Sequence, residues 1–411
     1  MFVLRPLAQR PIALLWTGQV LAATGAEFYM VAVVWIAADF VGRDAGYVSA
    51  FQAGALLVGS LFGGILTDRW RHGPTMISAD LLRAALMLLL SIAGALQFLS
   101  LPLLVAVAGG VALLTSVFEP ALQASLPAIA TDAALRHATN GLFDATKRMA
   151  RILGPSMIAL VNGFLPKTQF FTVTGATFLL SALAVRASAH AWPRETRHRQ
   201  ATGAAGVIDG LLGGMRGMRG HAVMIYGMVA GLIGNLTWAM GILLGMVLYL
   251  RETSAAPLTD YGLMMTAYGV GNLATNLVLA SAKPHRPATW LIASKLIFGA
   301  GVFMLPLAHG RVELMLIAAL AATNGPFENL AMLHLMQTRF QPHRIAQIYR
   351  LQMCAVFSGV LAAYLMSPSL FGWFGLAPTI MGGGAATFAI GLVGVGLAVW
   401  KRRRATRMRP V

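Results

Sequence analysis

The strongest candidate for a chemical role in this chain is a glutamate inside a long apolar run. Glu27 lies in the run 12–37, and Gln19, Ala23 and Glu27 share one helical face at a spacing of four, with Thr24 beside them. A carboxylate desolvated in such a run can take up and release a proton near neutral pH, so Glu27 is a candidate for proton coupling and, with Gln19, for substrate binding. The alternative is a glutamate that hydrogen-bonds neighbouring helices for packing alone.

Helical spacing in the run 139–163 places several polar residues on one face. Asn140, Asp144, Arg148 and Arg151 follow that face, and Arg151 lies furthest into the apolar part of the run. We expect Arg151 to hold an anionic group of a substrate or to pair with Glu27. The alternative is an ion pair with Asp80 or Asp144 that fixes the packing of helices.

Two later runs also carry polar residues in mid-span. Asn324 and Glu328 lie one turn apart in the run 312–337, which predicts a binding or proton-carrying role for Glu328 and a substrate-binding role for Asn324. Asn235 and Trp238 lie three apart in the run 221–250, where an amide and an indole ring are suited to contact a substrate. Packing within the core is the other interpretation of Trp238.

Apolar runs of about 20 residues position these side chains, and each is long enough to cross a bilayer as a helix. The chain is 57% hydrophobic and 11% charged, against roughly 25% charged residues in soluble domains. The sequence therefore predicts an all-α polytopic membrane protein with twelve transmembrane helices. They are expected at 12–37, 46–66, 75–97, 101–124, 139–163, 168–188, 221–250, 259–282, 289–308, 312–337, 345–368 and 375–400.

The net charge of +17 follows from this topology rather than from nucleic-acid binding. If the N-terminus is cytoplasmic, nearly all Lys and Arg residues of the loops and tails fall on the inside. The exceptions are Arg43, Lys167, Arg251 and Arg311. The positive-inside rule thus places both termini in the cytoplasm, where the basic tail 401–411 is expected to touch anionic membrane lipids.

One polar stretch is long enough to link two domains. Residues 189–220 separate an N-terminal six-helix bundle, 1–188, from a C-terminal six-helix bundle, 221–400. Within the stretch, Ile208, Leu211, Leu212 and Met215 recur at helical spacing beside Arg216 and Arg219. This pattern predicts an amphipathic helix on the cytoplasmic membrane surface.

A short charged turn lies between the second and third apolar runs, at residues 64–73. Gly64, Asp68 and Arg69 match in register the loop signature G-x-x-x-D-R-x-G-R-R, and the turn resembles that of the major facilitator superfamily. The departure is Arg71-His72-Gly73, which keeps basic character but not the order Gly-Arg-Arg.

Further segments resemble one branch of that superfamily. Residues 78–84, 118–127 and 150–155 look like the branch that contains the enterobactin exporter and macrolide efflux proteins. Gly154-Pro155 also resembles the helix-5 signature of drug/proton antiporters, although the glycines that often follow are absent from 156–159.

The resemblance implies parallel six-helix repeats around a central cavity. It also implies a gating latch on the cytoplasmic side, in which Glu119 pairs with the basic loop that holds Gly64, Asp68, Arg69 and Arg71. Substrate contact is the alternative for Glu119. The dipeptide Phe118-Glu119 recurs as Phe327-Glu328, a faint echo between the two halves.

These residues together predict secondary active transport, namely proton-driven export of a small amphipathic molecule across a bacterial plasma (inner) membrane. The resemblance to the enterobactin and macrolide exporters, together with Arg151, implies a siderophore-like metabolite as the first substrate and a macrolide-like drug as the next. Uptake by the same fold and a non-transporting receptor or lipid-handling scaffold are the alternatives. No P-loop, H-E-x-x-H or G-x-S-x-G motif is present, so we expect neither an enzyme nor a cofactor, and we expect a monomer.

Overall fold

The computed structural model describes residues 6–67, 71–130, 133–161, 164–188, 204–279 and 286–407, and these residues are almost entirely helical. Within this part of the chain no strand occurs, and eight segments are long and apolar enough to cross a membrane. The predicted all-α polytopic fold is confirmed. Helices occupy the expected apolar runs because backbone groups in lipid must be satisfied within their own segment.

The chain forms two compact units. The first comprises Met1–Val207 together with Ala256–Thr266, and the second comprises Ile208–Ala255 together with Ala267–Val411. The start of helix α10 therefore belongs to the first unit, although it follows the linker in sequence. Trp35 of α1 contacts Tyr261 of α10 at a ring-centroid distance of 6.3 Å, and the hydroxyls of Ser156 and Thr266 lie 2.8 Å apart.

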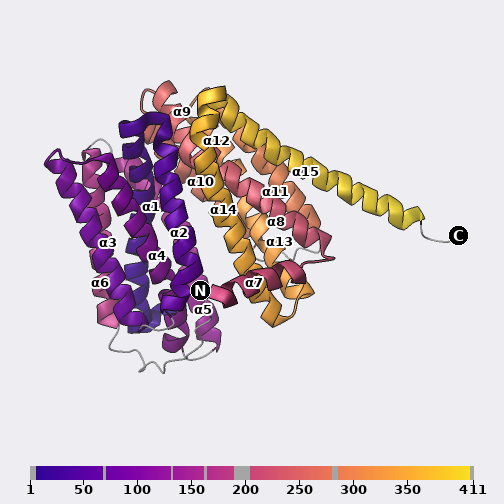
Figure 1. The fold of residues 1–411 in the computed structure, drawn as a ribbon, viewed down its shortest axis with the longest axis horizontal. Helices are drawn as coiled ribbons and strands as arrows, with labels where there is room; N and C mark the ends of the chain where they lie inside the picture. The colour runs from indigo at the N-terminus through magenta and orange to yellow at the C-terminus, as the bar shows by residue number, and fades with distance from the viewer. Residues whose placement is uncertain are drawn as a thin grey trace. The chain divides into compact units, whose positions relative to one another are not determined.

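The first unit consists mainly of six helices, coloured from indigo to magenta in Figure 1. They are α1 (Arg10–Val41), α2 (Ala45–Thr67), α3 (His72–Ala95), α4 (Leu101–Ile129), α5 (Ala133–Val161) and α6 (Phe170–Ser188). Helix α1 packs against α5 and α6, α3 against α4 and α6, and α2 against α4. Gly42, with a φ of 55°, ends α1 in a backbone conformation that favours glycine.

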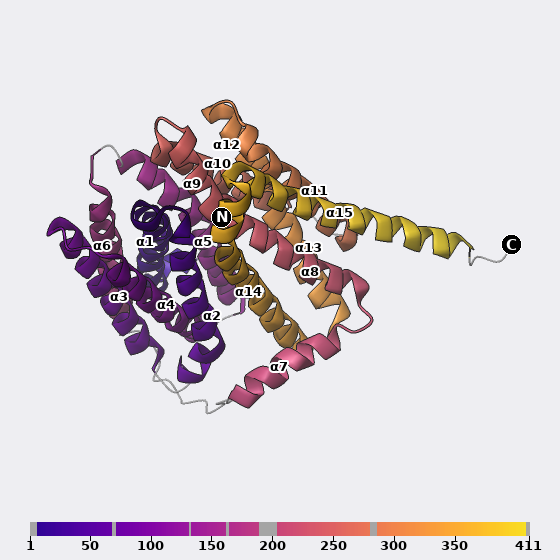
Figure 2. The ribbon, with the colours of Figure 1, turned by 45° about the horizontal axis from the view of Figure 1, so that its top comes forward.

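The second unit contains the remaining helices (Figure 2). They are most of α7 (Ala204–Gly217), α8 (Ala222–Thr237), η5 (Trp238–Gly245), α9 (Met246–Thr253), most of α10 (Pro257–Leu279), α11 (Pro287–Met304), α12 (Arg311–Ala321), α13 (Asn324–Arg339), α14 (Pro342–Phe374) and α15 (Leu376–Arg407). Helix α11 packs against α13 and α15, and α8 against α14 and α15. Prolines in the first turn of α11 and α14 mark their starts, where a missing N–H costs no helical hydrogen bond.

The run 312–337, predicted as one helix, is broken into α12 and α13 at Ala322 and Thr323. Pro326 explains the break, because its ring nitrogen cannot donate to the carbonyl of Ala322. The side-chain amide of Asn272 donates to that freed carbonyl at 3.1 Å. The run 221–250 is also irregular, because η5 is a π-helix between α8 and α9.

Helices α11 and α15 approach each other so closely that a side chain at Gly299 has no room. A Cβ there would clash with the backbone nitrogen of Phe388 and would lie 2.7 Å from the carbonyl oxygen of Gly384. We expect Gly299→Ala to lower the free energy of unfolding by about 1–3 kcal/mol, because backbone atoms must move apart. Thermal unfolding of the purified protein in detergent measures this change.

Gly396, which is exposed on α15, supplies the matched control. A Cβ at this position would have no neighbouring helix within 4 Å among the described residues. Gly396→Ala is expected to leave stability unchanged or to raise it by up to about 1 kcal/mol through helix propensity. Equal melting temperatures for Gly299→Ala and Gly396→Ala would contradict the close approach of α11 and α15.

Candidate functional site

A buried ion pair joins α11 and α13 in the second unit. The Lys295 ammonium lies 2.5 Å from Oε2 of Glu328, and the side chains are 0% and 12% exposed. Oδ1 of Asn324, one turn before Glu328, accepts a second hydrogen bond from Lys295 at 3.5 Å. Asn324 and Glu328, which the sequence grouped on one face, thus meet a cation from another helix.

Glycines of α8 make room for this pair. A Cβ at Gly231 would lie 2.7 Å from Oε1 of Glu328, and a Cβ at Gly234 would lie 2.7 Å from Nζ of Lys295. The smooth face of α8 therefore closes over both charged groups, which keeps water from Lys295 and leaves Glu328 as the more accessible member. Electrostatic interactions strengthen where water is excluded, so the two groups attract each other more strongly here than they would at the protein surface.

The two expected substrate residues of this region lie one helical turn apart. Asn235 follows Gly234 directly, and its amide donates to the carbonyl of Gly231 at 2.8 Å. Trp238 is half-buried at the first position of η5. Asn235 is therefore adjacent in sequence to the glycine face that covers Lys295, and Trp238 follows one turn later at the start of the π-helix.

The first unit holds a second buried cation. Arg83 and Asp80 form an ion pair within α3, as their spacing of three predicts, and the side chains are 4% and 0% exposed. The guanidinium lies between two rings, 4.4 Å from the centroid of Phe118 and 4.6 Å from that of Phe178. The negative charge of Glu119 in α4 also attracts the positive charge of Arg83 in α3.

Glu27 lies half-buried where α1 and α5 touch. A Cβ at Gly154 would lie 2.6 Å from Cβ of Glu27 and 3.0 Å from the backbone nitrogen of Phe28, so the two helix backbones meet at this point. Gln19, two turns earlier in α1, is buried. Arg151 lies one turn before Gly154 in α5, and its side chain, like that of Pro155, is outside the described part of the structure.

The expected latch is described only in part. Gly64 lies near the end of α2, but its surroundings are outside the described part of the structure. Asp68 and Arg69 are not among the described residues. Arg71 is exposed directly before α3, and Glu119 is half-buried in α4. The pairing of this loop with Glu119 stays a prediction.

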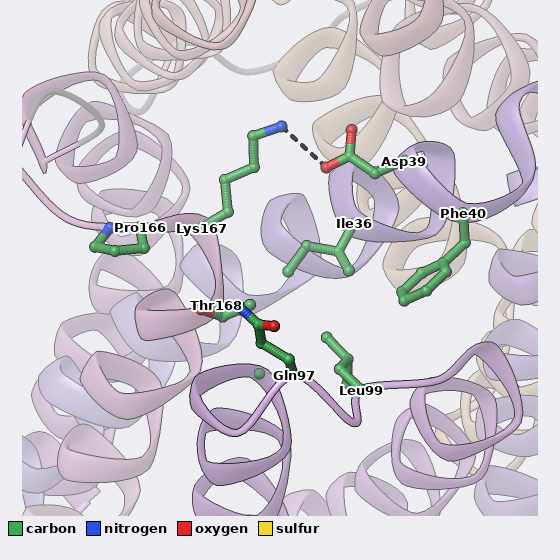
Figure 3. Close-up of a pocket in the computed structure, with 9 residues that line it drawn as sticks. Ile36, Asp39, Phe40, Gln97, Leu99, Pro166, Lys167 and Thr168 are labelled. Atoms are coloured by element: carbon green, nitrogen blue, oxygen red, sulfur yellow. Dashed lines mark hydrogen bonds and ion pairs between the residues drawn. The ribbon is translucent and has the colours of Figure 1, made fainter.

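A cavity of about 400 Å³ opens between the end of α1, the turn after α3 and the residues before α6 (Figure 3). Lys167 and Asp39 form an ion pair of 2.9 Å at its rim. Gln97, whose φ is 59°, also lines it. The residues that line this cavity include none of those expected to bind substrate.

Lys295 is the residue that sequence reasoning missed. The signal was present, because Lys295 is the only lysine or arginine in the apolar run 289–308. The structure also gives the Phe-Glu echo a physical basis. In each unit the glutamate after that phenylalanine interacts with a cation on the preceding long helix, Glu119 with Arg83 and Glu328 with Lys295.

Comparisons with known proteins agree with this architecture. No curated protein sequence matches the chain. Among solved structures, the POT family transporter PepTSo is similar with a TM-score of 0.73 at 12% identity, covering 98% of this chain and 99% of that one. A mutant form of the nucleoside transporter NupG is similar with a TM-score of 0.73 at 12% identity, covering 94% of this chain and 99% of that one. These likenesses show the fold.

The family is shown by a sequence model. The model of the Major Facilitator Superfamily matches residues 15–363, which is most of the chain, and reaches from α1 into α14. Together with the helical fold and the apolar spans, this makes the chain a multi-pass membrane protein and a secondary transporter rather than an enzyme. The chain belongs to the Major Facilitator Superfamily.

Proposed function

We propose that this transporter couples the entry of protons to the export of a small amphipathic molecule across the inner membrane of a bacterium, with both termini in the cytoplasm. The observation that carries the proposal is the buried Lys295–Glu328 pair. An ionisable pair inside apolar helices is costly to bury, and in a transporter a carboxylate placed there is a natural proton acceptor.

Protonation of Glu328 changes the balance of charge in the second unit. A proton on its carboxylate removes the charged partner of Lys295 and leaves the ammonium with the Asn324 amide oxygen, 3.5 Å away. An uncompensated buried cation is unfavourable, so the protonated state favours either a different packing of the helices or a bound anionic group. Proton binding and conformation are thereby linked.

Glu27 is the proposed proton acceptor of the first unit. Its position against Gly154 means that a change in its charge acts where α1 and α5 meet. With Gln19 and Arg151 on the same two helices, we assign this region to substrate binding, and Asn235, Trp238 and Asn324 to the corresponding region of the second unit. The proposed cytoplasmic latch consists of Gly64, Asp68, Arg69, Arg71 and Glu119.

The resemblance of residues 78–84, 118–127 and 150–155 to enterobactin and macrolide exporters supports a siderophore-like metabolite as substrate, with a macrolide-like drug next. The cations Lys295 and Arg151 are suited to an anionic group on such a molecule, and the amphipathic character follows from apolar helices that carry few polar side chains. We propose that the chain acts as a monomer.

Proton flux in everted membrane vesicles tests this function. The vesicles are energised, their interior pH is followed with a quenched dye, and iron-free siderophores, macrolides and dyes are added one at a time. One compound is expected to dissipate the gradient with the wild-type protein and not with Glu27→Gln or Glu328→Gln. The control is Glu313→Gln, which removes a carboxylate that is 46% exposed at the start of α12.

The amount of folded protein is measured in the same membranes. If no compound dissipates the gradient while the wild-type protein is folded and abundant, proton-coupled export of these classes is wrong. Gradient dissipation that persists in both glutamine variants would instead exclude these two carboxylates as the coupling groups.

A further inference from the structure

Helix α7 in the linker has two opposite faces, and one of them rests on α14. A Cβ at Gly214 would lie 2.9 Å from the carbonyl oxygen of Gln347, and a Cβ at Gly213 would lie 2.9 Å from the side-chain oxygen of the same residue. Met218, directly after the helix, is buried in the core of the second unit. The glycine face of α7 is therefore fixed on the backbone of α14.

The opposite face carries large apolar side chains. Ile208, Leu212 and Met215 follow one another at spacings of four and three, and they are 58%, 40% and 55% exposed. Residues at this spacing lie side by side along one face of a helix. A continuous apolar face of this kind marks a contact with a membrane or another protein.

Arginines flank the apolar face. Arg216 and Arg219 are exposed, and Arg344 of α14 is exposed next to Gly217. Within α7 the sequence carries one acid, Asp209, and one base, Arg216, while Arg219 and Arg344 lie just outside the helix. An apolar face with a basic border complements an anionic lipid surface, in which phosphates lie just above the acyl chains.

The direction of α7 also fits a membrane surface. Figures 1 and 2 show α7 running across the end of α14 rather than alongside it. Residues 347–374 of α14 are long and apolar enough to span a membrane. A helix laid across the end of a span lies at the depth of the lipid headgroups.

We propose that α7 is a binding surface for anionic phospholipid, with Arg216 and Arg219 on the headgroup phosphates and Ile208, Leu212 and Met215 at the boundary of the acyl chains. This surface does not include the proposed proton-coupling residues. The proposal therefore does not depend on which molecule is transported. The attraction to anionic lipid enriches it around α7 about fivefold for each arginine.

Quenching by brominated lipids tests the proposal on the full chain in vesicles. Cys354, the only cysteine, is replaced by serine, and Met215→Cys carries an environment-sensitive fluorophore. Brominated phosphatidylglycerol and brominated phosphatidylcholine are then compared at equal mole fraction. Both lipids are expected to quench the probe, with phosphatidylglycerol enriched about fivefold or more around it. The enrichment should fall as salt is raised.

Matched variants separate the effect of Arg216 and Arg219 from that of positive charge elsewhere on the protein. Arg216→Gln/Arg219→Gln is expected to make the two lipids quench equally, whereas Arg216→Lys/Arg219→Lys keeps the preference. Arg286→Gln/Arg339→Gln removes the same charge from two exposed positions outside α7 and is expected to change nothing.

Three results would overturn the proposal. Equal quenching by the two lipids in the wild-type background would show an apolar membrane contact without headgroup recognition. Absence of quenching by either lipid would show that water or protein covers the face. Self-quenching between labelled chains would identify a second copy of this chain as the occupant.

Discussion

Replacing Glu328 by glutamine is expected to destabilise the second unit by about 3–5 kcal/mol and to abolish proton-driven transport. The physical reason is the environment of Lys295, whose side chain is 0% exposed and whose carboxylate partner lies 2.5 Å away. Among the described residues, the ammonium then keeps only neutral partners. Thermal unfolding in detergent measures the stability, and dye quenching in everted vesicles measures the transport.

The reciprocal variant is expected to be milder. In Lys295→Met the remaining Glu328 is 12% exposed beside the glycine face of α8, so part of its carboxylate stays in contact with solvent. The lysine left behind in Glu328→Gln is 0% exposed, so no solvent compensates its charge. Glu328→Gln should therefore melt at a lower temperature than Lys295→Met.

The double variant Lys295→Met/Glu328→Leu separates folding from function. Apolar residues of similar volume often replace a buried ion pair without loss of stability, so we expect the melting temperature to return toward that of the wild type. Proton-driven transport should stay absent. If the double variant restores proton-driven transport along with stability, the pair serves packing alone.

Replacing Arg83 by methionine is expected to destabilise the first unit by about 3–5 kcal/mol, because Asp80 then remains buried without its cation. The side chain of Asp80 is 0% exposed, and its ion pair with Arg83 lies inside α3. The loss of contact with the rings of Phe118 and Phe178 adds to the effect. Thermal unfolding in detergent again gives the measurement.

Two further variants sharpen this prediction. Arg83→Lys should recover only part of the stability, because an ammonium cannot stack between two rings as a planar guanidinium does. Asp80→Leu/Arg83→Met removes both charges and should recover most of it. Transport by this double variant distinguishes the roles, since a pair that only holds the packing leaves transport intact. A wild-type melting temperature for Arg83→Met would contradict the assigned contacts.

The helices of this protein could be predicted from the sequence because apolar runs of spanning length have one stable backbone solution in lipid. The breaks within them could not. Pro326 lies inside an apolar run, and a proline in a membrane helix is tolerated when another group takes the freed carbonyl. That group is Asn272, which is 50 residues earlier than Ala322, and no local pattern connects the two.

Only part of the candidate site could likewise be predicted from the sequence. Glu328 and Asn324 stood out as polar residues in an apolar run, and Asp80 and Arg83 are three residues apart, a spacing that allows an ion pair on one helix face. Lys295 escaped because most cations of this sequence mark topology, although its place in mid-run was visible. Its pairing with Glu328 depends on which faces of α11 and α13 meet, and that is decided by close packing against Gly231 and Gly234 of α8.

The π-helical segment η5 gives the seventh spanning run a geometry that a regular α-helix does not have. A π-turn holds one residue more than an α-turn, so it shifts the phase of the side chains by about 100°. Between Trp238 and Gly245 the wider turns therefore offset the side chains of α9 from the directions that an unbroken continuation of α8 would give them.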